Sequence, residues 1–250
     1  MQISVITLFP DLVKSVIAEG VVGRAAKRGL VELNCVNPRD YAEDVHRTVD
    51  DRPYGGGPGM VMRPDCLLKS IRAERKRLGE TKVVYLTPQG RPIKQEMLKS
   101  LSEAESVVLL CGRYEGVDER VIDLEVDEEW SLGDFVLSGG ELAAMVVVDG
   151  VTRLLPEALG HDDSAVEDSF SDGLLDHPHY TRPEKIEDLE VPEVLLSGNH
   201  QHIKKWRRKQ ALGRTYLRRP DVLQEKDLSK QDMVLLDDFM KEIKTSEVKS

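Results

Sequence analysis

The stretch from Cys111 to Glu141 constrains the fold more than any other part of this chain. It reads CGRYEGVDERVIDLEVDEEWSLGDFVLSGGE. It holds two groups of glycines: Gly112 and Gly116, then Gly133, Gly139 and Gly140. An apolar run at 106–110, typical of a buried strand, precedes the first group, and another apolar run at 142–148 follows the second. Because glycine permits positive φ and close backbone approach, the pattern predicts two loops folded tightly around a ligand. Two ordinary turns are the alternative.

Within this stretch lie two long motifs, GRYEGVDER and SLGDFVLSGGELA. Together they resemble the bacterial tRNA (guanine-N1)-methyltransferases of the SPOUT superfamily of knotted methyltransferases. The resemblance runs from ITLFP near the start to GRTYLRRP near position 220. It implies an α/β fold with a parallel sheet and a C-terminal deep trefoil knot, here roughly residues 82–145, followed by a smaller, mostly helical domain. Chain threading is essentially absent among ordinary folds, so periodicity alone does not predict the knot.

The resemblance also implies a reaction and its partners. The expected reaction transfers a methyl group from S-adenosylmethionine to N1 of the guanosine at tRNA position 37, next to the anticodon. The expected enzyme is a homodimer whose active site is shared between subunits. The alternative is a related SPOUT-fold protein that binds or methylates RNA at a different target. A non-catalytic RNA-binding protein should lack the acid or the glycine loops, and both are present in this sequence.

Composition sets broad limits on the class of protein. The chain has 250 residues, 40% of them hydrophobic, which is enough for one large domain or two modest ones. No apolar run approaches the length that spans a bilayer, and MQISVITLFP lacks the basic region of a signal peptide. The three cysteines are far apart and form no CxxC pair. They predict reduced, buried thiols and a cytoplasmic protein without a membrane partner.

Strands and helices alternate in the first part of the chain, which predicts a largely parallel sheet. The expected strands are 3–8, 31–36, 82–86 and 106–110. The expected helices begin at Pro10 and cover 64–78, 93–101 and 142–155, the last one broken near Asp149-Gly150. Residues 160–173 are rich in Asp, Ser and Gly, as linkers are. We expect a SPOUT methyltransferase domain at 1–160, a flexible linker at 161–174 and a helical tRNA-binding domain at 175–250.

The methyl-donor site is carried over from the family onto matching positions. Tyr85, Leu86 and Pro88 lie at a strand end, where open α/β sheets bind ligands. The other expected donor-binding residues are Gly112, Tyr114, Glu115, Gly116, Ser131, Leu132, Gly133, Leu137, Gly139 and Gly140. Leu132 replaces a position that is commonly isoleucine, and Ala143 stands where relatives have proline, so that turn is expected to be looser.

Glu115 is the carboxylate of interest at the donor site. We expect it at the donor's sulfonium or as a ligand of Mg²⁺, a cation that the family resemblance implies. A surface charge in an acidic region is the alternative.

The glycine-rich loop at 50–59 lacks the Gly-Lys-Ser/Thr ending of a P-loop. The chain also lacks GxGxxG between a strand and a helix, so a nucleotide-hydrolysing or dinucleotide-binding enzyme is disfavoured.

The segment containing Glu-Asp-Ser-Phe matches the family's catalytic segment, so the resemblance makes Asp168 the general base. Residues alone favour an Asp that caps a helix or turn. Methylation of guanine N1 requires loss of the N1 proton, which a carboxylate within hydrogen-bond reach can accept. Negative charge then develops on O6, and Arg153 is our candidate to stabilise it. Charge complementarity at a helix C-terminus is the alternative role for Arg153.

A basic segment near the C-terminus predicts an RNA surface. Although the net charge is −10, eight Lys or Arg and no acidic residue lie between Lys204 and Arg219. The expected RNA contacts are Lys204, Lys205, Arg207, Arg208, Arg214 and Arg218. Two aromatics accompany these cations, which favours RNA over the alternative of a solvated helix face. A small-molecule nucleotide enzyme would not need this segment.

The group LDHPHYTRP supplies a further candidate contact. In line with the family, we expect Asp176 to contact the base. The neighbouring His177 and His179 raise the alternative of a zinc site. The rigid proline between the two histidines makes joint chelation a poor prospect. Relatives carry cysteine at the position of His177, so that histidine is not expected to be essential.

Overall fold

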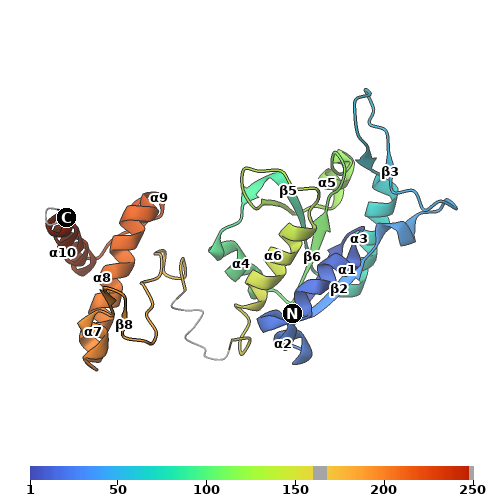
Figure 1. Cartoon of the computed structure of the whole chain (residues 1–250). Coiled ribbons are helices and arrows are strands. Elements are labelled where there is room, and N and C mark those ends of the chain that lie inside the picture. Colours follow the sequence, from blue (N-terminus) through green and yellow to red (C-terminus); the bar gives the residue numbers. More distant parts are fainter. Residues whose placement is uncertain (160–167, 248–250) are drawn as a thin grey trace. The chain divides into compact units, whose positions relative to one another are not determined.

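The computed structural model describes residues 1–159 and 168–247. The chain divides into two compact units, Met1–Asp162 and Asp163–Ser250, and each is described by itself (Figure 1). Among the described residues, the first unit is built on a five-stranded sheet with the order β2-β1-β6-β5-β7, in which all neighbours are parallel. The strands are β1 (Gln2–Ile6), β2 (Glu32–Val36), β5 (Lys82–Pro92), β6 (Ser106–Cys111) and β7 (Glu128–Ser131). The predicted α/β class with a parallel sheet is confirmed.

Helices cover both faces of this sheet. They are α1 (Pro10–Lys14), α2 (Gly20–Lys27), α3 (Pro64–Leu78), α4 (Gln95–Ser102), α5 (Glu119–Glu125) and α6 (Glu141–Thr152), with 3-10 turns η1 (Ser15–Ile17) and η2 (Pro38–Tyr41). Buried side chains of α1, α2, α4 and α6 form one core with Leu109 of β6, and those of α3 and α5 form the other with Leu110. Consecutive residues of a strand point to opposite faces, so the wholly buried β6 serves both cores.

Helix α6 runs unbroken through Asp149 and Gly150, so the predicted break is wrong. The glycine is explained by packing. A Cβ at Gly150 would lie 2.7 Å from Leu98 Cδ1 on α4. Gly150 therefore allows two helices to approach each other closely, although a glycine inside a helix is locally unfavourable.

Strand β7 was not expected from the sequence, because it is short and acidic. Trp130 is its buried apolar residue, at 3% exposure. Glu128 is held at the edge of the sheet by ion pairs of 2.7 Å to Lys82 and 2.8 Å to Arg91. Strand β5 is longer than expected because it continues to Pro92 after a shift in register against β7 between Leu86 and Arg91.

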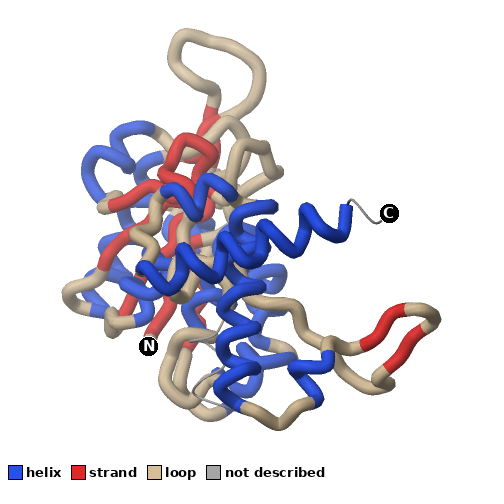
Figure 2. Tube along the Cα trace, turned by 90° about the vertical axis from the view of Figure 1, so that its left-hand side faces the viewer, coloured by secondary structure: helices blue, strands red, loops and turns tan. Residues whose placement is uncertain are grey.

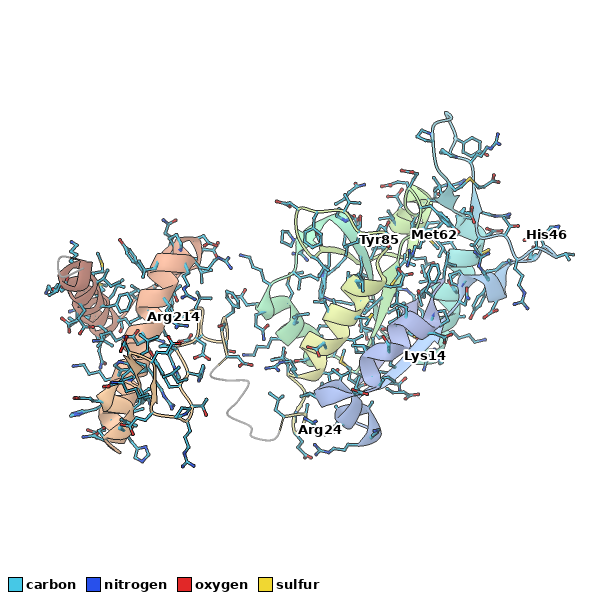
Figure 3. All side chains as sticks on the ribbon, viewed as in Figure 1. Lys14, Arg24, His46, Met62, Tyr85 and Arg214 are labelled. Carbon is cyan, nitrogen blue, oxygen red and sulfur yellow. The ribbon has the colours of Figure 1, made fainter. Side chains whose placement is uncertain are left out.

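A short hairpin connects the glycine-rich loop to the GRYEG motif. Its strands are β3 (Asp50–Asp51) and β4 (Val61–Met62). Met62 N donates to Gly116 O at 2.9 Å, and Glu115 N donates to Met60 O at 2.9 Å. Met62 is fully buried, and Figure 3 labels it together with Tyr85 of β5. The end of the glycine-rich loop is therefore attached to one of the predicted donor loops.

The second unit is mostly helical. It contains the hairpin β8 (Lys185–Ile186) and β9 (Leu189–Glu190), seen in Figure 2, and the helices α7 (Glu193–Leu196), α8 (His200–Arg218), α9 (Pro220–Gln224) and α10 (Lys230–Glu247). Its core contains Leu174, Leu212 and Leu235. Helix α8 begins after Asn199, whose side chain caps it by accepting from His202 N at 3.2 Å.

Residues 161–167 of the linker expected at 161–174 lie outside the described residues. The described remainder, 168–174, packs against the rest of the second unit. Leu174 is 2% exposed in the core, and the Asp172 carboxylate pairs with Arg208. One apolar residue and one ion pair therefore anchor a segment whose composition is polar. Within residues 1–159 and 168–247, no helix has both the length and the apolar character required to cross a membrane.

Candidate functional site

A cavity of about 440 Å³ lies at the carboxyl ends of β6, β5 and β7. Every donor-site residue predicted from the sequence lines it: Tyr85, Leu86, Pro88, Gly112, Tyr114, Glu115, Gly116, Ser131, Leu132, Gly133, Leu137, Gly139 and Gly140. They come from three segments that are separated along the chain. The order of the parallel strands brings them together, because neighbouring strands end at the same edge of the sheet.

The two glycine groups contact each other through their backbones. Gly140 N donates to Gly112 O at 3.0 Å, and a Cβ at Gly140 would lie 2.9 Å from Cys111 Cα. A Cβ at Gly112 would lie 2.8 Å from Tyr85 Oη. Both positions are therefore too close to their neighbours for a side chain. The predicted close approach of these loops is confirmed.

A buried charged network lies beside the cavity, and the sequence analysis missed it. Glu141 is 1% exposed and forms a 3.0 Å ion pair with Arg113 Nε. Thr7 Oγ1 donates to Glu141 at 2.9 Å, while Arg113 Nη1 donates to Ser138 O at 3.0 Å and its guanidinium lies 4.2 Å from the Phe9 ring centroid. A buried carboxylate requires such partners. The available signal was a single acid directly before an apolar run.

Two further cavity residues differ in their surroundings. Tyr85 is buried, and burial raises the pKa of its phenol, so the ring stays neutral around pH 7. Glu115 is exposed, and its side chain lies over Gly59, where a Cβ would clash with it. Among the described residues, Glu115 belongs to no group of three His, Cys, Asp or Glu side chains with metal-site spacing.

The predicted catalytic pair is divided between the units. Arg153 caps the end of α6 in the first unit, where its N–H donates to Asp149 O at 3.1 Å. Asp168 belongs to the second unit, where its carbonyl accepts from Ser171 N at 3.1 Å. The approach of Asp168 and Arg153 to each other and to the cavity is a prediction.

Three cations of the basic segment form ion pairs with acids that lie outside it. The segment therefore has fewer unpaired positive charges than expected. Arg208 pairs with Asp172 and, at 2.8 Å, with Asp232. The other two pairs are Lys209 with Glu242 at 2.6 Å and Arg219 with Asp221 at 2.6 Å. The Asp232 and Asp172 carboxylates raise the pKa of Arg208. Arg208 therefore binds α10 and the 168–174 segment, and its predicted contact with RNA stays a prediction.

The other predicted RNA contacts also lie on α8. Lys204, Lys205, Arg207 and Arg218 are exposed, and Arg214 is half-buried. In the part of the chain that the structure describes, no acid lies within ion-pair distance of Lys204, Lys205, Arg214 or Arg218. A cationic surface on α8 therefore remains after the three neutralised residues are removed.

Asp176 lies in the same unit and is half-buried. Burial opposes its ionisation, but hydrogen bonds from the His179 ring and the His177 backbone N–H hold the pKa of this carboxyl below its usual range. Asp176 is therefore an ionised acceptor at neutral pH.

A parallel sheet with a glycine-lined cavity at its carboxyl edge defines an α/β enzyme fold with one principal ligand site. The family model described as tRNA (Guanine-1)-methyltransferase TrmD matches residues 1–225. The tRNA (guanine-N(1)-)-methyltransferase of Pseudomonas putida (strain W619) is 57% identical over 243 residues, which are 97% of each chain. That of Pseudoalteromonas translucida (strain TAC 125) is 57% identical over 97% of this chain and 95% of its own. The chain belongs to the tRNA (guanine-1)-methyltransferase family and is a methyltransferase.

Proposed function

We propose that this chain transfers a methyl group from S-adenosylmethionine to N1 of the guanosine at position 37 of tRNA, in the cytoplasm. The observation that carries the proposal is the cavity at the carboxyl ends of β5, β6 and β7, which gathers every motif residue expected at the donor site. Membership of the family supplies the reaction class. The cationic surface of α8 is consistent with a polyanionic substrate.

The residues of the cavity fit the proposed donor. A volume of about 440 Å³ lies within the range of small-ligand sites. Bound there, S-adenosylmethionine supplies an electrophilic methyl group. Gly112, Gly133 and Gly140 line the cavity, and their backbone groups bind the adenine and ribose of the donor in this proposal. Leu132 and Leu137 offer apolar contacts to the adenine ring.

Asp168 and Arg153 act on the guanine in this proposal. The Asp168 carboxylate accepts the N1 proton, which makes N1 nucleophilic. Arg153 stabilises the negative charge that develops on O6, and Asp176 holds the base by accepting hydrogen bonds from it. Lys204, Lys205, Arg207, Arg214 and Arg218 bind phosphates of the tRNA.

We further propose a homodimer in which Asp168 of one subunit acts at the donor cavity of the other. We also propose a trefoil knot at about 82–145. The knot is supported by the return of the chain after β7 to the end of β6, where Gly140 contacts Gly112. Glu115 is the proposed Mg²⁺ ligand, with water and the bound substrates supplying the other ligands.

The test is methylation of a defined tRNA. The chain is incubated with radiolabelled methyl donor and with a tRNA transcript that has guanosine at position 37, and the modified base is then mapped. We expect N1-methylguanosine at position 37. A matched transcript with adenosine at position 37 should stay unlabelled. Label at another position would favour a related RNA methyltransferase with a different target, and donor-independent tRNA binding without label would favour an RNA-binding protein.

A further inference from the structure

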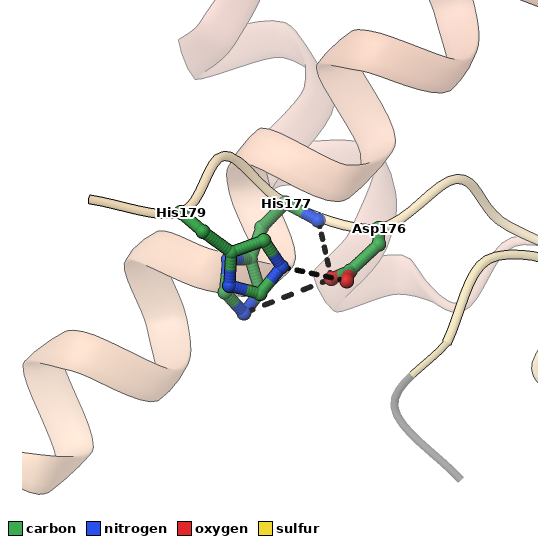
Figure 4. A group of neighbouring side chains, drawn as sticks. All are labelled: Asp176, His177 and His179. Atoms are coloured by element: carbon green, nitrogen blue, oxygen red, sulfur yellow. Dashed lines mark hydrogen bonds and ion pairs between the residues drawn. The ribbon is translucent and has the colours of Figure 1, made fainter. Parts of the chain in front are cut away.

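The segment after Leu175 brings one carboxylate and two imidazoles to the same place, as Figure 4 shows. Asp176, His177 and His179 each offer a ligand atom, and these three atoms lie within 4.8 Å of one another. The imidazole rings are 4.4 Å apart between centroids. Pro178 therefore does not hold the two imidazoles apart, although the sequence argument made joint chelation a poor prospect. A residue before proline is held extended, and side chains two residues apart in extended chain lie on the same side.

The distances match those of a tetrahedral metal site. His179 Nε2 lies 2.8 Å from Asp176 Oδ2, and His177 Nε2 lies 3.7 Å from Asp176 Oδ1. Zn²⁺ binds imidazole nitrogen and carboxylate oxygen at about 2.0–2.2 Å, which places its tetrahedral ligands about 3.4 Å apart. The two observed distances lie on either side of this value and run to different oxygens of Asp176, so the side chains must rotate to admit an ion.

The orientation of the histidines supports ligation. His177 Nδ1 lies 3.1 Å from Pro178 O, so a proton on Nδ1 is donated to that carbonyl and Nε2 keeps its lone pair toward Asp176. A backbone acceptor on the far ring nitrogen is the usual support of a metal-binding histidine. A hydrogen bond from His179 to Asp176 explains the position of His179. It gives no reason for the His177 ring to face the same carboxylate.

Burial fixes two of the three ligands and leaves the third accessible. The side chains of His177 and Asp176 are 11% and 24% exposed, and that of His179 is 70% exposed. The backbone beneath them is held as well, since Asp176 N donates to Ser169 Oγ at 3.0 Å. The site therefore has a preformed half and an open side through which an ion and water can enter.

We propose that Asp176, His177 and His179 bind a borderline transition-metal ion such as Zn²⁺, with water in the fourth position. Two imidazoles and one carboxylate are a zinc-type ligand set, whereas Mg²⁺ and Ca²⁺ prefer oxygen ligands. One consequence rests on the proposed function. An ion on Asp176 occupies the carboxylate that is proposed to hold guanine, so the metal and the base exclude each other.

Metal titration of the full-length, chelator-treated protein tests the proposal directly. Zn²⁺ alone is followed by isothermal titration calorimetry, and Co²⁺ alone by its visible absorption. We expect about one ion per chain, and at least tenfold weaker binding in His177→Ala and in His179→Ala. His46→Ala, which removes an exposed histidine of the first unit, is the matched control and should bind as the unsubstituted protein does. Circular dichroism of each variant verifies its fold.

Two outcomes overturn the metal site. One is Zn²⁺ affinity weaker than about 100 μM in the unsubstituted protein. The other is undiminished binding in a variant that lacks both histidines, which would assign the ion to other residues such as the free thiols of Cys35, Cys66 and Cys111. The titration contains no tRNA and no methyl donor. Its result is therefore independent of the methylation test, and either proposal can fail while the other stands.

Discussion

Gly140 and Gly150 lie near each other in the chain but meet different neighbours. A Cβ at Gly140 would lie 2.9 Å from Cys111 Cα, which is backbone and cannot move alone. A Cβ at Gly150 would lie 2.7 Å from Leu98 Cδ1, the end of a side chain that can rotate. The same alanine substitution therefore has different consequences at the two positions.

We predict that Gly140→Ala weakens binding of S-adenosylmethionine at least tenfold, because the shifted loop distorts the cavity. Gly150→Ala should keep the donor affinity and change the free energy of unfolding by no more than about 1–3 kcal/mol, the usual range for overpacking. Calorimetric titration with the donor and thermal denaturation measure the two effects. If Gly140→Ala binds the donor normally, this cavity is not the donor site.

Asp168 is the residue on which the proposed chemistry depends. We predict that Asp168→Asn leaves donor affinity unchanged and lowers the single-turnover rate by about 10²–10⁴-fold, the range expected for a general base. Asp172→Asn is the matched control in the same segment. It removes the partner of Arg208 and should cost stability while the chemical step is retained. A near-normal rate in Asp168→Asn removes this residue from the mechanism.

At the level of elements, the sequence predicted the helices and strands whose burial shows directly in the order of apolar and polar residues. The strand at 106–110 and the helix at 64–78 were predictable because apolar runs and periodicity report burial directly. Strand β7 was not predictable, because it begins with Glu128 and Glu129 and Trp130 is its single buried apolar residue. The break predicted at Gly150 is wrong because this glycine serves the close approach of α4. A local sequence pattern carries no information about such a contact.

The candidate site divides in the same way. The glycine loops were found because their residues are contiguous motifs. The Arg113–Glu141 pair was missed because its partners are distant in sequence. Similarly, the charge of α8 was overestimated because Asp232 and Glu242, which neutralise Arg208 and Lys209, lie on α10.

This correction gives a sharper prediction for α8. The double variant Lys204→Gln with Lys205→Gln should weaken tRNA binding and make the salt dependence of the binding constant shallower by about one to two units of log–log slope, because fewer counterions are released. The control is Lys209→Gln with Arg219→Gln, whose cations are already paired with acids and should change the slope less. Filter binding across a salt series measures both. If the Lys204→Gln, Lys205→Gln variant keeps the slope of the unsubstituted protein, α8 is an ordinary solvated helix.

At the scale of the whole molecule, the predicted catalytic groups belong to separate units. The donor cavity and Arg153 lie in the first unit, while Asp168, Asp176 and α8 lie in the second. The proposed site is complete only where the second unit of one subunit meets a first-unit cavity, either its own or its partner's. In a two-fold dimer, each second unit can serve the partner's cavity, so that two equal sites form.

Mixing two inactive variants tests this shared site. Asp168→Asn keeps the donor cavity intact. Gly140→Trp keeps Asp168, but its indole ring blocks the donor cavity. After random subunit exchange, half of the dimers are heterodimers, and each of these has one site with an intact cavity and an intact Asp168. The mixture should therefore regain about a quarter of the activity of the unsubstituted enzyme, provided that the site is composite. Heterodimers purified through two different affinity tags should regain about half. If tagged heterodimers form and remain inactive, Asp168 does not act at the partner's cavity.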